Sequence, residues 1–197
     1  MKFIKENSYD IVKLLINQLG IAIFSMMLYL SVALIEDKGV KASMNILVSV
    51  LSTLFYFALL YAACWEFGAK DRIRIDGGKM KKSPFKGALL SLFANLINFL
   101  TVGIAIICKI IHAFGGDEAF NFVFAILNTF FRFILSMYLG AINGIFSYIS
   151  DVDTSFLVQS IGYFVAPIIS ILVCQLGYWL GSREFRFWSL FSGNKKS

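Results

Sequence analysis

Charged residues are scarce in this sequence, and so are histidine and cysteine. Asp, Glu, Lys and Arg make up 15% of its 197 residues, against about 25% in an ordinary soluble domain. The single histidine, His112, excludes a zinc site of the HExxH type, which requires two. Cys64, Cys108 and Cys174 lack CxxC spacing, so we expect apolar free thiols rather than a disulfide framework or a metal site. These absences exclude a disulfide-stapled secreted module.

Hydrophobic residues are abundant and form 58% of the chain. They gather in five long runs, at residues 14–35, 42–65, 87–108, 119–150 and 154–182. At about 1.5 Å per residue, each run is long enough as a helix to cross an apolar layer of about 30 Å. Arg132 is the only charged residue inside them, a segregation that fits lipid as the solvent. The sequence therefore predicts an all-α fold: a polytopic transmembrane helical bundle of five apolar helices, as a single integral membrane domain over residues 1–197.

Basic residues predict which side of the membrane each end faces. The connection 66–86 holds seven of them, Lys70, Arg72, Arg74, Lys79, Lys81, Lys82 and Lys86, against three acidic residues. Cytoplasmic connections are enriched in Lys and Arg, so we expect this connection and the N-terminus to be cytoplasmic. The net charge of +6 lies beside apolar runs, which favours membrane lipids as partners and argues against nucleic acid.

The run 119–150 can be threaded through the membrane in two ways. A fifth crossing leaves 10 basic residues inside and 7 outside, whereas a re-entrant hairpin leaves 14 and 3, which obeys the positive-inside rule better. On a single helix, however, the polar residues of the run fall within an arc of about 100°. They are Asn121, Asn128, Thr129, Arg132, Ser136, Asn143 and Ser147. We therefore favour one continuous helix, and the side that carries the C-terminus stays open.

Arg132 is the most singular residue, because no acidic residue lies in any run to pair with it. Burying its charge costs about 2.5–3.5 kcal/mol, so polar groups have to solvate it. One interpretation is structural, with nearby amides and hydroxyls acting as interhelical contacts. The other is a ligand site, in which the guanidinium binds a carboxylate or phosphate group. The residues of this polar stripe are Arg132, Asn128, Ser136, Asn143, Asn95 and Asn98.

Small residues predict which helices touch. The spacing small-xxx-small occurs at Gly140 and Gly144, at Gly162 and Ala166, and at Gly177 and Gly181. The first two pairs lie at similar distances from the turn near residue 152, so we expect the fourth and fifth helices to pack across them. The third pair is then left free for a partner.

The connection 66–86 also shows local order. Arg72-Ile73-Arg74-Ile75 alternates, and Asp76-Gly77-Gly78 supplies a turn, a pattern typical of a short β-hairpin. We expect a basic, β-hairpin-like cytoplasmic loop, with an ordinary solvated loop as the alternative. The cations expected at lipid headgroups are Arg72, Arg74, Lys79, Lys81 and Lys82.

Several segments carry a resemblance. They are Trp65-Glu66-Phe67-Gly68-Ala69-Lys70-Asp71-Arg72, then Gly78, Gly87 and Ala94-Asn95, and later Pro167 and Gly177-Tyr178-Trp179-Leu180-Gly181. Over roughly residues 60–100 and 165–181, the chain resembles small uncharacterised multi-pass membrane proteins of bacteria. The resemblance implies the bacterial cytoplasmic (inner) membrane and transfers no catalytic or binding residue.

These patterns predict a non-enzymatic membrane protein, either transporter-like or an accessory subunit, with the polar stripe around Arg132 as its site. The alternative is a scaffold that uses small-residue helix faces to contact a membrane-protein partner or a second copy of the chain. A lipid-modifying enzyme is less favoured, because none of the runs holds a pair of carboxylates. No catalytic residue, metal or cofactor is predicted.

Overall fold

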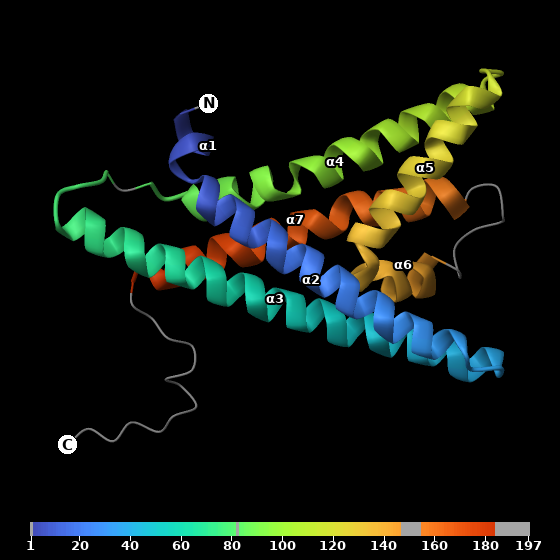
Figure 1. Ribbon diagram of the computed structural model, residues 1–197, viewed down its shortest axis with the longest axis horizontal. Coiled ribbons are helices and arrows are strands. Elements are labelled where there is room, and N and C mark those ends of the chain that lie inside the picture. The colour runs from blue at the N-terminus through green and yellow to red at the C-terminus, as the bar shows by residue number, and fades with distance from the viewer. Residues whose placement is uncertain (1, 82, 147–154, 184–197) are drawn as a thin grey trace.

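The computed structural model describes residues 2–81, 83–146 and 155–183, and within them the chain forms helices and no strands (Figure 1). The helices are α1 (Lys2–Glu6), α2 (Ser8–Ala33), α3 (Lys38–Asp76), α4 (Lys86–Ala113), α5 (Glu118–Ile134), the 3-10 turn η1 (Ser136–Tyr138), α6 (Leu139–Phe146) and α7 (Ser155–Gly181). Four of them, α2, α3, α4 and α7, are long and apolar enough to cross a membrane, and α5 with its continuation would make a fifth crossing only as a bent pair. The predicted all-helical class is confirmed.

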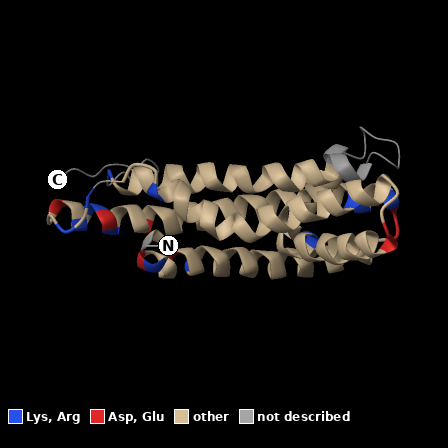
Figure 2. Cartoon of the chain, turned by 90° about the horizontal axis from the view of Figure 1, so that it is seen from above, with Lys and Arg blue, Asp and Glu red and all other residues tan. Residues whose placement is uncertain are grey.

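The long helices form a bundle whose charged residues lie mainly toward its two ends (Figure 2). At one end, Lys13 near the start of α2 lies 2.6 Å from Glu66 of α3, measured from Nζ to Oε2. Lys86, the first residue of α4, pairs with Asp71 of α3 at the same end. α7 also ends here (Figure 1). We call this the basic end: it is formed by the starts of α2 and α4 and the last turns of α3 and α7.

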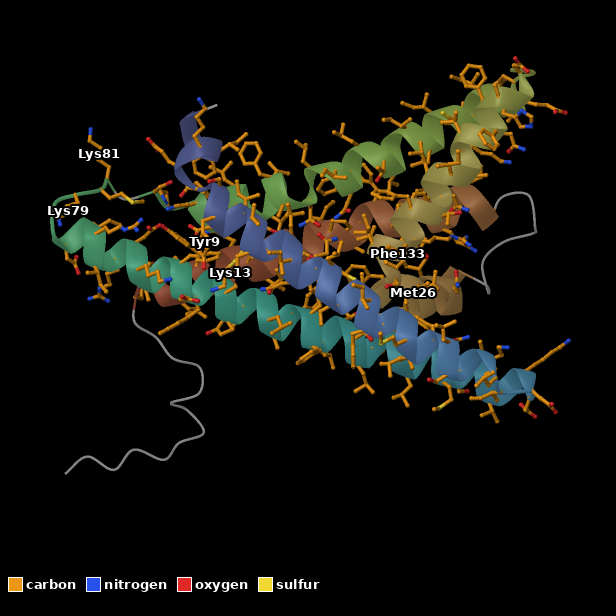
Figure 3. All side chains as sticks on the ribbon, in the orientation of Figure 1. Tyr9, Lys13, Met26, Lys79, Lys81 and Phe133 are labelled. Carbon is orange, nitrogen blue, oxygen red and sulfur yellow. A yellow bond between two sulfur atoms is a disulfide. The ribbon has the colours of Figure 1, made fainter. Side chains whose placement is uncertain are left out.

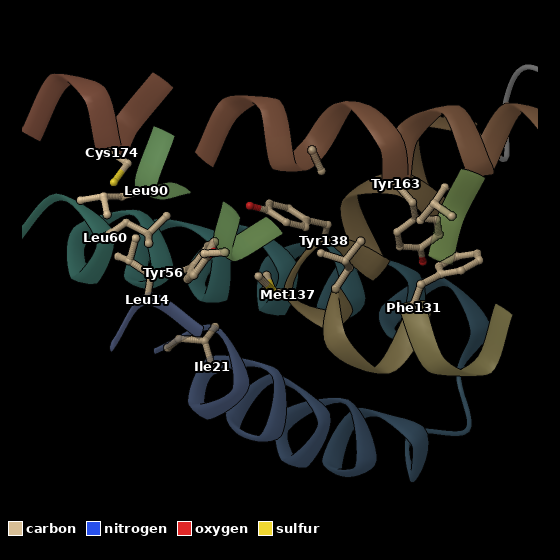
Figure 4. Close-up of a cluster of buried hydrophobic side chains, with 14 of the residues drawn as sticks. Leu14, Ile21, Tyr56, Leu60, Leu90, Phe131, Met137, Tyr138, Tyr163 and Cys174 are labelled. Atoms are coloured by element: carbon tan, nitrogen blue, oxygen red, sulfur yellow. The ribbon is translucent and has the colours of Figure 1, made fainter. Parts of the chain in front are cut away.

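The hydrophobic core runs along the middle of the bundle. Leu60 of α3, Leu90 of α4 and Cys174 of α7 come together there (Figure 4). Large buried rings extend the core toward the other end, where Tyr56 of α3 meets Tyr138 of η1 edge-on. The outward faces of the four long helices remain apolar and exposed, as expected for helices surrounded by lipid.

The run 119–150 is not one continuous helix, because α5 and α6 are bent by 80° at a short break. The carbonyl of Met137 lies beside Ser49 of α3, whereas Gly144, further along the chain, lies beside Ile46, nearer to the start of α3. α6 therefore runs back toward the end of the bundle at which α5 and α7 begin (Figure 1). The prediction of a continuous helix is therefore wrong, and the α5–α6 pair is either a broken span or a re-entrant hairpin.

Neighbouring helices provide the polar contacts that stabilise the break. Ser49 and Thr53 of α3 donate to the carbonyl of Met137, at 2.7 Å and 3.0 Å. Ser136 donates to the carbonyl of Ala22 in α2 at 2.9 Å. A backbone carbonyl freed at a helix end within lipid has to be satisfied by protein. The periodicity of 119–150 gave no sign of the break, because these partners lie in other runs.

The predicted β-hairpin in 66–86 is also wrong. α3 continues as a helix of 39 residues to Asp76, about 58 Å long at 1.5 Å per residue. The i,i+4 pairs Glu66–Lys70 and Arg72–Asp76 support the added turns. Gly78 then takes φ of 67°, and the N–H of Lys79 bonds the carbonyl of Arg74, as in a Schellman motif. The alternating Arg and Ile residues therefore lie in the last turns of a helix.

Two of the three cysteines are bonded, contrary to the prediction of free thiols. Cys64 of α3 and Cys174 of α7 form a disulfide across 110 residues of sequence, with Cα atoms 5.4 Å apart. Cys108 is free and buried. No local spacing in the sequence predicts this disulfide, because only the packing of α3 on α7 brings the two Cα atoms together.

The glycines pack differently from the prediction. A side chain on Gly140 would collide with the backbone of Asn45 in α3, so this glycine faces α3 and not α7. Gly177 lies against Tyr61 of α3, and Gly181 against the backbone of Trp65. The patch expected to be free for a partner is therefore filled within the chain.

Candidate functional site

Arg132 lies in the last turn of α5, just before the bend, and this helix carries it into the bundle beside α7. The neighbouring Phe131 is buried, with its ring centroid 5.1 Å from that of Tyr163 in α7. This contact fixes the rotation of α5 and directs the guanidinium toward the first turns of α7. There, Nη2 of Arg132 donates to Oε1 of Gln159 at 2.9 Å.

Several polar atoms on the parts of α5 and α7 that carry this pair are buried without a hydrogen-bond partner. They are Nε of Arg132, Oδ1 of Asn128, Oγ of Ser160 and the hydroxyl of Tyr163. Asn128 lies one turn before Arg132 on α5, and Ser160 and Tyr163 lie three residues apart on α7. The ring of Tyr163 contacts Phe131, the residue next to Arg132. A buried polar atom left unpaired costs about 1–3 kcal/mol, so this group is the strongest candidate for a ligand or for ordered water.

The charge of Arg132 is also not neutralised within the part of the chain that the structure describes, since none of its ion pairs involves this residue. The same ranges contain no group of three His, Cys, Asp or Glu that could hold a metal ion. The arrangement therefore offers hydrogen-bond donors and one positive charge, which is the chemistry of an anion site.

The rest of the predicted polar stripe lies elsewhere. Asn95 donates to the carbonyl of Ser91, and Asn98 donates to Oδ1 of Asn95, so this chain of bonds runs within α4. Ser136 is used at the helix break. Asn143 is exposed and lines a separate cavity with Tyr29 and Asn45. Ser147 lies outside the described residues.

Of the residues in this candidate site, Arg132 and Asn128 were predicted from the sequence, whereas Gln159, Ser160 and Tyr163 were not. A signal was present, because these three are polar residues close together at the start of an apolar run. Ser136 and Asn143 were predicted in their place, because the projection of 119–150 on a single helix puts these two residues on the same face as Arg132.

At the basic end, by contrast, buried charges are paired. Nζ of Lys86 lies 2.7 Å from Oδ2 of Asp71, and the two side chains are only 5% and 4% exposed. Tyr178 donates to the same carboxylate at 2.9 Å. Lys13 and Lys70 both contact Glu66 at 2.6 Å. This cluster holds the ends of the helices together.

The cations predicted at lipid headgroups lie around this end. Lys79 and Lys81 project from the connection between α3 and α4 (Figure 3). The side chain of Arg74 is 63% exposed, whereas Arg72 is half-buried and contacts Asp76. Lys82 lies outside the described residues.

No family model matches the chain, and no curated protein sequence or solved structure is significantly similar to it. The resemblance to small multi-pass membrane proteins of bacteria therefore stays a prediction. The fold and the site carry the functional argument.

Proposed function

We propose that this chain is a non-enzymatic multi-pass integral membrane protein, transporter-like or an accessory membrane subunit, that binds an anionic group at Arg132. The observation that carries the proposal is the set of unpaired polar atoms around the guanidinium, above all Nε of Arg132 and the hydroxyl of Tyr163. A carboxylate or phosphate group would accept from both.

We infer that the α5–α6 pair is a re-entrant hairpin, because α5 and α7 begin at the same end of the bundle (Figure 1), and this hairpin supports the proposal. Non-helical backbone at membrane depth is tolerated where protein buries it or where it lines a polar cavity, and discontinuous helices often form the binding sites of transporters. Here the break lies three residues after Arg132, at Leu135. The hairpin thus combines a charged side chain and an interrupted helix in one place.

We also infer the orientation. With four crossings and a hairpin, the starts of α2 and α4 and the ends of α3 and α7 share one side, which collects 14 basic residues against 3 on the other. By the positive-inside rule, that side is cytoplasmic. The placement in the bacterial cytoplasmic membrane remains part of this proposal and rests on the resemblance alone.

The alternative, a scaffold that recruits a partner through small-residue faces, has less support, because Gly140, Gly177 and Gly181 are already in contact with α3. The lipid-modifying enzyme has no observation in its favour among the described residues.

The test is the thermal unfolding of the purified full-length protein in a neutral detergent, with sodium chloride replaced by sodium phosphate or sodium acetate at constant ionic strength. We expect the unfolding temperature of the wild-type protein to rise with the concentration of one of these anions, because a ligand that binds only the folded state stabilises it. Arg132→Leu abolishes the rise. Arg132→Lys, which keeps the charge but loses the planar fork, weakens it.

Arg74→Leu is the matched control, since it removes an exposed arginine and should leave the anion response intact. If the wild-type protein shows no response and Arg132→Leu is simply more stable, then Arg132 is a structural residue and the proposal fails. An equal response in Arg132→Leu and in the wild-type protein has the same meaning.

A further inference from the structure

A different cavity lies at the basic end, between the last turn of α3, the segment before α4 and the last turn of α7. Its volume is about 490 Å³. The polar and charged side chains around it include Arg72 and Asp76 of α3, Ser83 before α4, and Ser182 and Arg183 at the end of α7. Trp179 and Pro84 supply apolar walls. None of these residues contributes to the site at Arg132.

The two arginines reach this cavity from different helices. The guanidinium carbon of Arg183 lies 4.0 Å from the ring centroid of Trp179. Stacking uses the face of a guanidinium and leaves its in-plane N–H groups for an acceptor. Nε of Arg72 lies 3.5 Å from Oδ2 of Asp76, whose side chain is 69% exposed and therefore largely hydrated. The cavity thus combines two arginines, one solvated carboxylate and two serines, of which Ser182 already donates to the carbonyl of Trp179.

The cavity also lies at the depth of lipid headgroups. α7 is apolar enough to cross the membrane up to Gly181, and Gly181 lies against Trp65 of α3. Arg72 is seven residues beyond Trp65, about 10 Å further along the helix. A tryptophan followed by an arginine at the end of a span is typical of the membrane–water interface.

We propose that this cavity binds the headgroup of an anionic phospholipid, with Arg72 and Arg183 at the phosphate and Trp179 and Pro84 against the glycerol and upper acyl chains. Charge complementarity selects an anionic lipid, and the apolar walls select a lipid over a soluble phosphate. The proposal is distinct from a general attraction between the exposed cations of this end and the membrane, because it assigns the binding to two residues in a defined cavity.

The experiment measures lipids retained by the full-length protein in native mass spectrometry, with phosphatidylglycerol, phosphatidylcholine or sn-glycerol 3-phosphate added to the detergent-solubilised sample. We expect one phosphatidylglycerol to be retained preferentially. Arg72→Gln/Arg183→Gln should weaken its retention about tenfold or more, as expected for the loss of charge-assisted hydrogen bonds. Arg74→Gln, which removes an exposed arginine of the same helix from outside the cavity, should change it less than about twofold.

Three results overturn the proposal. Equal losses in Arg74→Gln and in the double variant indicate diffuse surface electrostatics. Equal retention of phosphatidylcholine and phosphatidylglycerol removes the selection by charge. Equal binding of sn-glycerol 3-phosphate and phosphatidylglycerol assigns the cavity to a soluble organophosphate. Arg183→Gln alone, which leaves the Arg72–Asp76 contact in place, tests the cavity if the double variant does not fold.

Discussion

The basic end and the surroundings of Arg132 treat buried polar groups in opposite ways. At the basic end, Lys86 and Asp71 are almost completely buried but paired, and Tyr178 donates a hydrogen bond to the same carboxylate. A backbone N–H in the first turn of α4 also has a partner on another helix, since Ala88 donates to Oε1 of Gln175 in α7. By contrast, Arg132 has one amide partner while its Nε and nearby hydroxyls have none.

We propose that this difference separates structural polar groups from functional ones. A fully paired cluster stabilises one arrangement of the helices and has nothing left to offer a ligand. A cluster with unpaired donors is less stable as it stands and gains energy when an acceptor arrives. Substitutions at the basic end should therefore change stability, and substitutions around Arg132 should change ligand binding more than stability.

The largest effect is expected from Gly181→Val. A side chain at this position would collide with the backbone of Trp65, which no rotamer change can relieve, so α7 cannot dock on α3 and we expect no folded monomer by size-exclusion chromatography in detergent. Gly103→Val is the control, because nothing lies within 4 Å of that position. Similar elution profiles for the two variants would contradict the tight contact of α3 and α7.

Lys86→Met comes next. It leaves the buried carboxylate of Asp71 with only the more distant Arg74, 3.8 Å from Oδ1, as a cation, and breaking a buried pair costs about 3–5 kcal/mol in measured cases. Unfolding in denaturant should show this loss, and Lys86→Met/Asp71→Leu should recover most of it by removing the stranded charge. Lys70→Met, at an exposed pair with Glu66, should change stability by less than about 1 kcal/mol. A double variant no more stable than Lys86→Met would refute the pairing.

The disulfide should contribute less. Reduction, or Cys64→Ser, is expected to lower the free energy of unfolding by about 2–4 kcal/mol. Maleimide labelling of the denatured protein should modify one thiol without reductant and three with it, because only Cys108 is free. Three thiols modified in the absence of reductant would show that Cys64 and Cys174 are not bonded.

The smallest effect is expected from Tyr163→Phe. Its hydroxyl is buried without a partner, so its removal should not lower the free energy of unfolding, whereas Tyr178→Phe takes a hydrogen bond from a buried carboxylate and should cost about 1–3 kcal/mol. Thermal unfolding of both variants makes the comparison. A weaker anion response in Tyr163→Phe, at unchanged stability, would place this hydroxyl in the anion site; a large loss of stability would count against the contrast between the two regions.

The segments on which the predicted resemblance to bacterial membrane proteins rests come together in the fold. Gly68 and Gly87 both lie against Tyr178, and Gly181 lies against Trp65. In the sequence these residues lie in three separate stretches, and nothing within one stretch explains its spacing from the others. In the structure they form one junction of α3, α4 and α7, where close contact between backbones leaves no room for a side chain.

Composition and periodicity were sufficient where each residue depends on its own run and on the solvent around it. The long apolar segments, their helical state and the singular position of Arg132 follow from the cost of placing charges and open backbone groups in lipid. Only the tertiary structure decided four other features. They are the bend at Leu135, the disulfide, the pairing of Lys86 with Asp71, and the position of Gln159 and Tyr163 close to α5 at Arg132. Each of these depends on partners from another helix, and no pattern within one run records which helix will lie beside it.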